Sequence, residues 1–152
     1  MHENKDQSAT IAEEVRAELC GQGGQWETAL EDGEILTEIR IPISTMNANS
    51  CYLKFPQPAS RYPYVGCAIS INCSNSNCND IRVGLSGVGE FAFRDKGVED
   101  SIRGEAINET SIENASSKAT EGRNVLIDSF VSEDYRRAMA KVFVKRAIVK
   151  LS

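Results

Sequence analysis

The chain has 152 residues, with 17 lysines and arginines against 22 aspartates and glutamates, which gives a net charge of −5. Hydrophobic residues make up 41% and charged residues 26% of the sequence, a balance that excludes a disordered or a membrane-embedded chain and fits one globular domain with a tail. The acidic balance also argues against nucleic acid or an anionic membrane surface as the main partner, because both carry negative charge themselves.

The first twenty residues predict a short amphipathic helix. Thr10 and Glu13 have the spacing of a capping box, and apolar residues then recur at every fourth position. The glycines that follow this segment predict the end of the helix and a flexible joint. We therefore expect residues 1–24 to form a helical arm with a Gly-rich linker, and residues 25–152 to form the domain.

Four segments with period-two or β-rich patterns predict strands. They cover residues 33–42, 51–55, 64–73 and 81–86. The first ends at Pro42, which cannot donate to a ladder. The polar insert over residues 74–80 is expected to turn the chain. Because the segments follow one another closely, we expect an antiparallel meander with one face on the core.

The remainder of the chain predicts helices. A short segment is marked by Val98 and Ile102, and a weakly amphipathic one over residues 108–120 is closed by Gly122. Ser132 is a good N-cap for a long final helix, whose acidic start and basic end suit the helix dipole. Its predicted apolar stripe consists of Tyr135, Met139, Val142, Phe143 and Ala147, with Ile148 at the edge. The fold class is therefore α+β: an antiparallel three- to four-stranded meander sheet packed against C-terminal helices.

Several residues around the final helix have predicted structural roles. We expect Tyr135 to pack in the apolar stripe, and Arg136 and Arg137 to pair with carboxylates one helical turn away or in a loop. Asp128 is expected to anchor the connection before the helix. Where the last strand leaves the sheet, we expect the backbone to approach a neighbouring segment closely or to adopt a positive φ, because glycines stand at positions 84, 87 and 89.

Cysteine and histidine usage excludes several kinds of catalytic site. Five cysteines without a paired framework, in a chain with no apolar leader, indicate reduced thiols and a cytoplasmic location. Cys73 and Cys78 are the only close pair and His2 is the only histidine, so we expect no metal site. Without a histidine held by the fold, triad chemistry is excluded as well. The sequence also lacks a Gly-rich phosphate loop, and we predict no catalytic residue in this chain.

Five segments together carry a family resemblance. They occur at residues 33–42 (GEILTEIRIP), 52–55, 56–66 (PQPASRYPYVG), 81–89 (IRVGLSGVG) and 133–148 (EDYRRAMAKVFVKRAI). In this order they resemble the C-terminal domain of the flavoprotein (medium) subunit of molybdenum hydroxylases, the carbon monoxide dehydrogenase and xanthine dehydrogenase family. The resemblance covers about residues 28–151 and leaves the first 24 residues unexplained.

The resemblance implies a role in electron transfer. In this family a molybdenum large subunit hydroxylates the substrate, an iron–sulfur small subunit relays electrons, and the FAD of the medium subunit passes them to an acceptor. FAD is held mainly by two N-terminal subdomains, which are missing from this sequence. We therefore expect the chain to be an accessory domain that is not catalytic alone, with FAD shared with FAD-binding subdomains on another chain. A homo-oligomer is a further possible assembly.

The resemblance also implies which residues lie beside the flavin. The strand that ends at Lys54 and the loop after it lie next to the flavin ring in the family, where a lysine cation would stabilise the negative charge of the reduced flavin. Tyr52 and Tyr64 are candidates for an aromatic wall, and Arg61 at the loop tip is a candidate donor to a phosphate, a carboxylate or a neighbouring subunit. Each has a plain alternative: a solvated lysine, half-buried strand tyrosines and a surface arginine.

Two other functions stay open. The first is a non-enzymatic interaction or oligomerisation module that retains the fold without flavin, using the N-terminal amphipathic helix as a docking element. The second is a small-molecule binder with a pocket under the proline-rich loop of residues 56–63.

Overall fold

The computed structural model describes residues 32–35, 37–38 and 49–152. The chain divides into two compact units, residues 1–47 and 48–152. The predicted N-terminal helix, its linker and the boundary after residue 24 lie outside the described residues. So does most of the strand predicted over residues 33–42, and its described residues belong to no strand.

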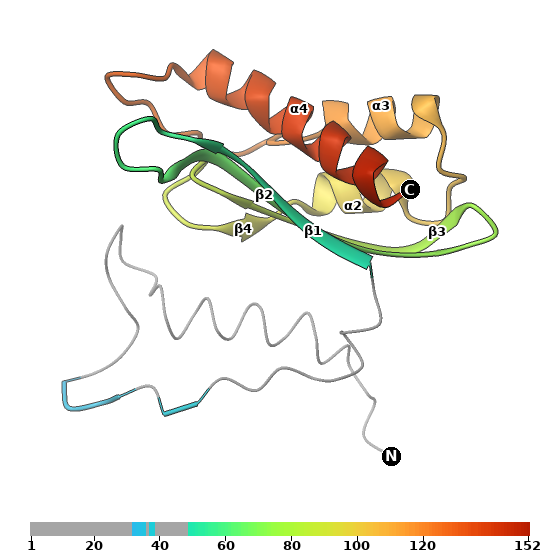
Figure 1. Cartoon of the computed structure of the whole chain (residues 1–152), viewed down its shortest axis with the longest axis horizontal. Coiled ribbons are helices and arrows are strands. Elements are labelled where there is room, and N and C mark those ends of the chain that lie inside the picture. The colour runs from blue at the N-terminus through green and yellow to red at the C-terminus, as the bar shows by residue number, and fades with distance from the viewer. Residues whose placement is uncertain (1–31, 36, 39–48) are drawn as a thin grey trace. The chain divides into compact units, whose positions relative to one another are not determined.

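The second unit contains a four-stranded antiparallel meander (Figure 1). Its strands are β1 (Asn49–Pro56), β2 (Pro63–Ser74), β3 (Asn77–Ser86) and the short β4 (Phe93–Arg94), and they neighbour one another in chain order. The strands predicted over residues 51–55, 64–73 and 81–86 are confirmed as parts of β1, β2 and β3.

The turn between β2 and β3 is shorter than the sequence predicts. We expected residues 74–80 to form the turn, but β3 already begins at Asn77, and only Asn75 and Ser76 connect the strands. Both have positive φ values, 51° and 65°, as a tight type I′ hairpin requires. Asn tolerates this conformation well, but the usual glycine is absent, and so the turn signal is weak in the sequence.

Three helices follow the sheet: α2 (Lys96–Ile102), α3 (Glu109–Ser117) and α4 (Glu133–Leu151). The predicted N-cap is confirmed, because the Ser132 hydroxyl accepts a hydrogen bond from the Tyr135 amide. The Asn108 side chain caps α3 in a reciprocal box with Ser111. All three helices lie on the same side of the sheet (Figure 1). The α+β fold with helices on one face of a meander is therefore confirmed. Among the described residues, no helix has the length and apolar character needed to cross a membrane.

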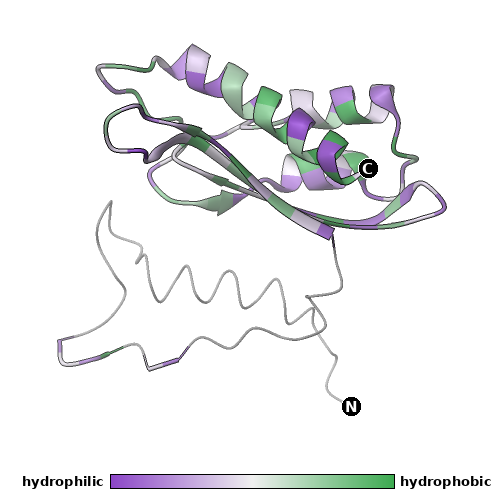
Figure 2. Ribbon diagram, in the orientation of Figure 1, coloured by the Kyte–Doolittle hydropathy of each residue, from purple (hydrophilic) through white to green (hydrophobic). Residues whose placement is uncertain are grey.

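The core lies between the sheet and the helices. It is built from alternate residues of β2 and β3 and from apolar residues of the helices: Val65, Cys67, Ile69, Ile71, Ile81, Val83, Leu85, Val98, Ile102, Ile112, Ala140, Val144 and Ile148. Figure 2 shows hydrophobic and hydrophilic positions interspersed along the strands and α4. Cys67 is fully buried and acts as a small hydrophobic side chain, as its apolar surroundings in the sequence predict.

The buried face of α4 differs from the predicted stripe. Phe143, Ala147 and Ile148 are buried as expected, but Tyr135 is 47% exposed and Val142 is 36% exposed. Arg136 is instead 3% exposed and begins the buried face. The helix carries apolar residues on more than one side, and only the packing against β1 and β2 decides which side is covered.

Candidate functional site

The face of the sheet opposite α2–α4 forms a surface of mostly small side chains, which we call the open face. The strand register arranges it in three rows across β1, β2 and β3. The rows are Ser50, Ser70 and Arg82, then Tyr52, Ala68 and Gly84, then Lys54, Gly66 and Ser86. The alternation of strands makes this face the counterpart of the core face. Tyr52, Lys54 and Arg82 are the three large side chains on a floor of glycine, alanine and serine.

Tyr52 lies diagonally across Gly66. A β-carbon at Gly66 would come within 2.4 Å of the Tyr52 hydroxyl and 3.1 Å of its Cε2 atom. The ring therefore occupies the space where another residue would have its side chain, and it remains 52% exposed. Aromatic side chains can reach diagonal neighbours on a sheet in this way.

Lys54 and Arg61 meet at the end of β1. The Lys54 ammonium donates a hydrogen bond of 3.3 Å to the Arg61 carbonyl. Among the described residues, no carboxylate pairs with Lys54 and no acceptor binds the Arg61 guanidinium. Two cationic groups therefore stand at this end of the open face with donors left to offer a ligand.

The loop that carries Arg61 is held in one conformation. The Gln57 amide donates to the Tyr62 carbonyl at 2.7 Å, and the Arg61 amide donates to the Gln57 carbonyl at 2.9 Å. Arg61 has a φ of 60°, in the left-handed region that a non-glycine residue rarely adopts. Prolines at 56, 58 and 63 further restrict the chain, so Lys54 meets a preorganised loop.

Tyr64 does not share this arrangement. Its ring packs against Phe55 at a centroid distance of 5.6 Å, and the Arg136 guanidinium lies 5.8 Å from its centroid. Phe55 also contacts Tyr135 and Phe143 of α4, so this aromatic group belongs to the packing between β1 and α4. The structure thus brings Tyr52, Lys54 and Arg61 together along β1 and its loop, and gives Tyr64 other partners.

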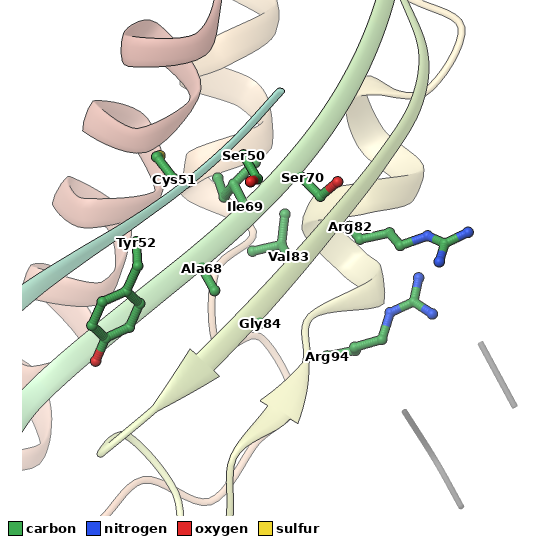
Figure 3. A pocket seen from close by; sticks show the side chains of 10 residues that line it. All are labelled: Ser50, Cys51, Tyr52, Ala68, Ile69, Ser70, Arg82, Val83, Gly84 and Arg94. Carbon is green, nitrogen blue, oxygen red and sulfur yellow. The ribbon is translucent and has the colours of Figure 1, made fainter. Parts of the chain in front are cut away.

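A shallow depression of about 510 Å³ occupies the middle of the open face. Figure 3 shows Tyr52 beside β2 on one side of it and the side chains of Arg82 and Arg94 projecting on the other. Both arginines have acidic partners: Arg82 is 3.5 Å from Asp80, and Arg94 is 2.7 Å from Glu99. Both arginines at the depression are therefore paired with carboxylates, whereas Lys54 and Arg61 at the end of β1 have no acidic partner among the described residues.

Cysteine chemistry at this surface is disfavoured. Cys51 borders the depression, and burial raises the pKa of its thiol. Burial also raises the pKa of Cys67 to about 12 and that of Cys78 to about 11. Thiols with such pKa values stay protonated near neutral pH and are poor nucleophiles. The described residues contain no cluster of histidine, cysteine or carboxylate side chains that could hold a metal ion.

Arg136 and Arg137 both have structural roles, and only some of their contacts are predictable from the sequence. Arg137 pairs with Glu133 one turn away, and Arg136 pairs with Asp128 in the preceding loop, as predicted. Arg136 also donates to the carbonyls of Tyr64, Gly87 and Leu126. Arginine is seldom buried, and two of the partners of Arg136, Tyr64 and Gly87, lie 72 and 49 residues away in the chain, where the sequence gives no sign of them.

Asp128 anchors its loop, as expected. One carboxylate oxygen accepts hydrogen bonds of 2.8 Å from the amides of Phe130 and Val131, and the other accepts one from Arg136. These donors hold the pKa of Asp128 below its usual range, the Phe130 amide most strongly. Of the three glycines predicted to need special conformations, Gly87 has a positive φ of 72° and approaches the Pro63 carbonyl, whereas Gly84 and Gly89 do not adopt a positive φ.

Comparisons with known proteins agree with this architecture. Residues 50–151 match the family described as the CO dehydrogenase flavoprotein C-terminal domain. The carbon monoxide dehydrogenase medium chain of Hydrogenophaga pseudoflava is 29% identical over 125 residues, which cover 82% of this chain and 44% of that protein. The nicotine 6-hydroxylase medium subunit of Paenarthrobacter nicotinovorans is 25% identical over 84% of this chain and 44% of that protein.

Solved structures give the same result. Carbon monoxide dehydrogenase from Hydrogenophaga pseudoflava superimposes with a TM-score of 0.77 and 28% identity, over 84% of this chain and 45% of that chain. Quinoline 2-oxidoreductase from Pseudomonas putida 86 superimposes with a TM-score of 0.74 and 29% identity, over 85% of this chain and 45% of that chain. The chain thus spans less than half the length of the relatives it matches.

Proposed function

Because the chain belongs to the CO dehydrogenase flavoprotein C-terminal domain family, we propose that it forms one wall of an FAD site in the medium subunit of a molybdenum hydroxylase-type oxidoreductase. In this proposal, FAD-binding subdomains outside residues 1–152 supply the other wall. When bound between the two walls, FAD would supply the electron-carrying chemistry between the other centres of the complex and an acceptor.

One observation carries the proposal. Tyr52, Lys54 and Arg61, which the family resemblance assigns to the flavin surroundings, gather at one end of the open face with an exposed ring and two cationic groups that have no acidic partner among the described residues. A planar anionic cofactor fits this donor set, because the ring offers a stacking surface and the cations offer charge.

Each residue then has a distinct role. The Tyr52 ring covers part of the cofactor and excludes water from it. Lys54 contributes a positive charge next to the cofactor, and its bond to the Arg61 carbonyl orients the ammonium. Arg61 offers a planar pair of donors to a phosphate or to a carboxylate of a neighbouring subunit. Tyr64 contributes indirectly, since its packing with Phe55 and Arg136 supports the start of β2.

The family also suggests partners. We propose that the assembled protein contacts an iron–sulfur small subunit and a molybdenum large subunit, and that it works in the cytoplasm. Medium chains of carbon monoxide dehydrogenase and of nicotine 6-hydroxylase among the relatives support the proposal that the protein has subunit partners, because their names mark them as parts of larger assemblies.

Isolation from the native source tests the proposal. We expect the purified material to show flavin bands in its visible spectrum and to contain FAD-binding subdomains, either on the same polypeptide or on a co-eluting chain identified by mass. A colourless chain without such subdomains would contradict the proposal and favour the non-enzymatic interaction module.

A substitution at Lys54 tests the site itself. In the native complex we expect Lys54→Ala to weaken flavin affinity and to lower the reduction potential of the flavin, because a positive charge that stabilises the reduced form is lost. Lys141→Ala is a matched control, since Lys141 is an exposed lysine on α4, on the helix side of the sheet. Equal affinity and potential in the two variants would remove Lys54 from the flavin site.

A further inference from the structure

Gly66 occupies a position where the backbone itself does not require glycine. It lies inside β2 and is paired on both sides, with Lys54 of β1 and Ser86 of β3. Its φ is not in the left-handed region. Glycine weakens a strand interior, so its presence there commonly marks a close approach by another group.

The group that approaches Gly66 is the Tyr52 side chain. A β-carbon at Gly66 would lie 2.4 Å from both the Tyr52 hydroxyl oxygen and the Ser86 hydroxyl oxygen, distances that no real β-carbon adopts. Only a residue without a side chain allows the Tyr52 ring to lie this close to the sheet.

Gly84 shows that not every glycine on this face behaves in this way. It lies on β3, two residues before Ser86, and its side also points to the open face. A β-carbon there would meet only Ala68, at 3.9 Å, which is an ordinary contact. A methyl group added at Gly84 therefore fits, whereas the same group at Gly66 must displace a ring.

We propose that Gly66 is a positioning residue of the flavin site. Because it has no side chain, the Tyr52 ring can lie close to the sheet, and this sets the distance and angle between that ring and the bound cofactor. The inference rests on the proposed function. Both atoms that a methyl group would strike are the ends of rotatable side chains, and so Gly66→Ala is expected to move the ring and leave the fold intact.

The position of the Tyr52 ring next to Gly66 can be measured without flavin. In the NMR spectrum of the full 152-residue chain, we expect one Gly66 Hα proton to be displaced from its ordinary chemical shift by the nearby edge of the Tyr52 ring and to return toward that ordinary shift in Tyr52→Leu. Gly84 protons serve as the internal reference. An unshifted Gly66 proton in the unmodified chain would overturn the inference.

The consequence for the cofactor is measured as flavin affinity in the native complex. We expect Gly66→Ala to weaken flavin binding about 2- to 10-fold, the range of one aromatic contact, and Gly84→Ala to leave it unchanged. In a Tyr52→Leu background, Gly66→Ala should have no further effect, because the ring that it displaces is gone.

The outcomes separate the two proposals. If the unmodified complex holds no flavin, the proposed function fails, and with it the role of Gly66 in a flavin site. If flavin is present but Gly66→Ala behaves like Gly84→Ala, or weakens binding equally with and without Tyr52, the proposed function stands and the role of Gly66 is refuted.

Discussion

Removal of the Arg136 side chain should destabilise the domain more than any surface substitution on α4. Its guanidinium donates hydrogen bonds to the carbonyls of Leu126 at 3.0 Å, Tyr64 at 2.8 Å and Gly87 at 2.6 Å, and to the Asp128 carboxylate at 2.6 Å. One side chain therefore joins the start of β2, the end of β3 and the loop before α4.

The loss in free energy of unfolding caused by Arg136→Met can be worked out from the acceptors that lose their hydrogen-bond donor. Methionine keeps much of the buried aliphatic volume, but three carbonyls and a carboxylate lose their donor. Removing one partner of a buried charge pair costs about 3–5 kcal/mol. Each carbonyl left without a donor adds about 1–3 kcal/mol unless water reaches it. Asp128 is 42% exposed and can be hydrated, so we expect a net loss of about 3–5 kcal/mol.

Urea unfolding of the full chain measures this loss. With a slope of about 1–3 kcal/mol per molar urea, the midpoint should fall by about 1–5 M. Arg146→Met is the matched control: Arg146 is exposed and stacks 5.6 Å from the Phe143 centroid, a contact of about 0.5–1 kcal/mol.

A second variant keeps the prediction testable if Arg136→Met does not fold. Arg136→Lys keeps the charge but not the planar fork, and it should lie between the unmodified chain and Arg136→Met. If Arg136→Met falls within about 0.5 kcal/mol of Arg146→Met, the reasoning about its buried hydrogen bonds is wrong.

Three further predictions concern other positions. Glu99→Gln should cost about 2–3 kcal/mol in thermal or urea unfolding, because the buried carboxylate accepts both Arg94 and a backbone amide; an unchanged midpoint would refute it. Arg61→Gly should stabilise the chain by about 0.5–1 kcal/mol, as relief of left-handed strain exceeds the added chain entropy of glycine, and a loss of stability would contradict this. Cys67 has its pKa raised from 9.0 to about 12 in the folded state, so its thiol binds its proton more tightly when folded. Its contribution to the free energy of unfolding is fully present below pH 9 and is lost as the pH rises toward 12. In Cys67→Ala, the free energy of unfolding should therefore fall less steeply above pH 9. A pH profile identical to that of the unmodified chain would contradict this.

Local patterns determined much of the fold. Period-two alternation identified the cores of β2 and β3, because one face of each strand is buried and the other is not. Ser132 marked the start of α4, since its hydroxyl satisfies an amide that the helix leaves free. These signals are local and need no knowledge of distant residues. The ordered set of segments also identified the family over the part that residues 50–151 match.

Tertiary contacts decided which residues meet. Tyr52 and Gly66 lie 14 positions apart and touch only because the β1–β2 register sets them diagonally. Tyr64 shares the aromatic character of Tyr52, yet the shift in register near Pro56 and the packing of α4 turn it toward Phe55.

The same holds for α4, where periodicity allowed more than one buried stripe. Only the fit against the sheet chose the stripe that begins with Arg136, because three carbonyls from distant segments converge there and a charged side chain can satisfy them all. Sequence alone therefore identified β1 to β3, α4 and the family. The neighbours of each functional side chain depend on contacts between distant segments, which only the folded chain brings together.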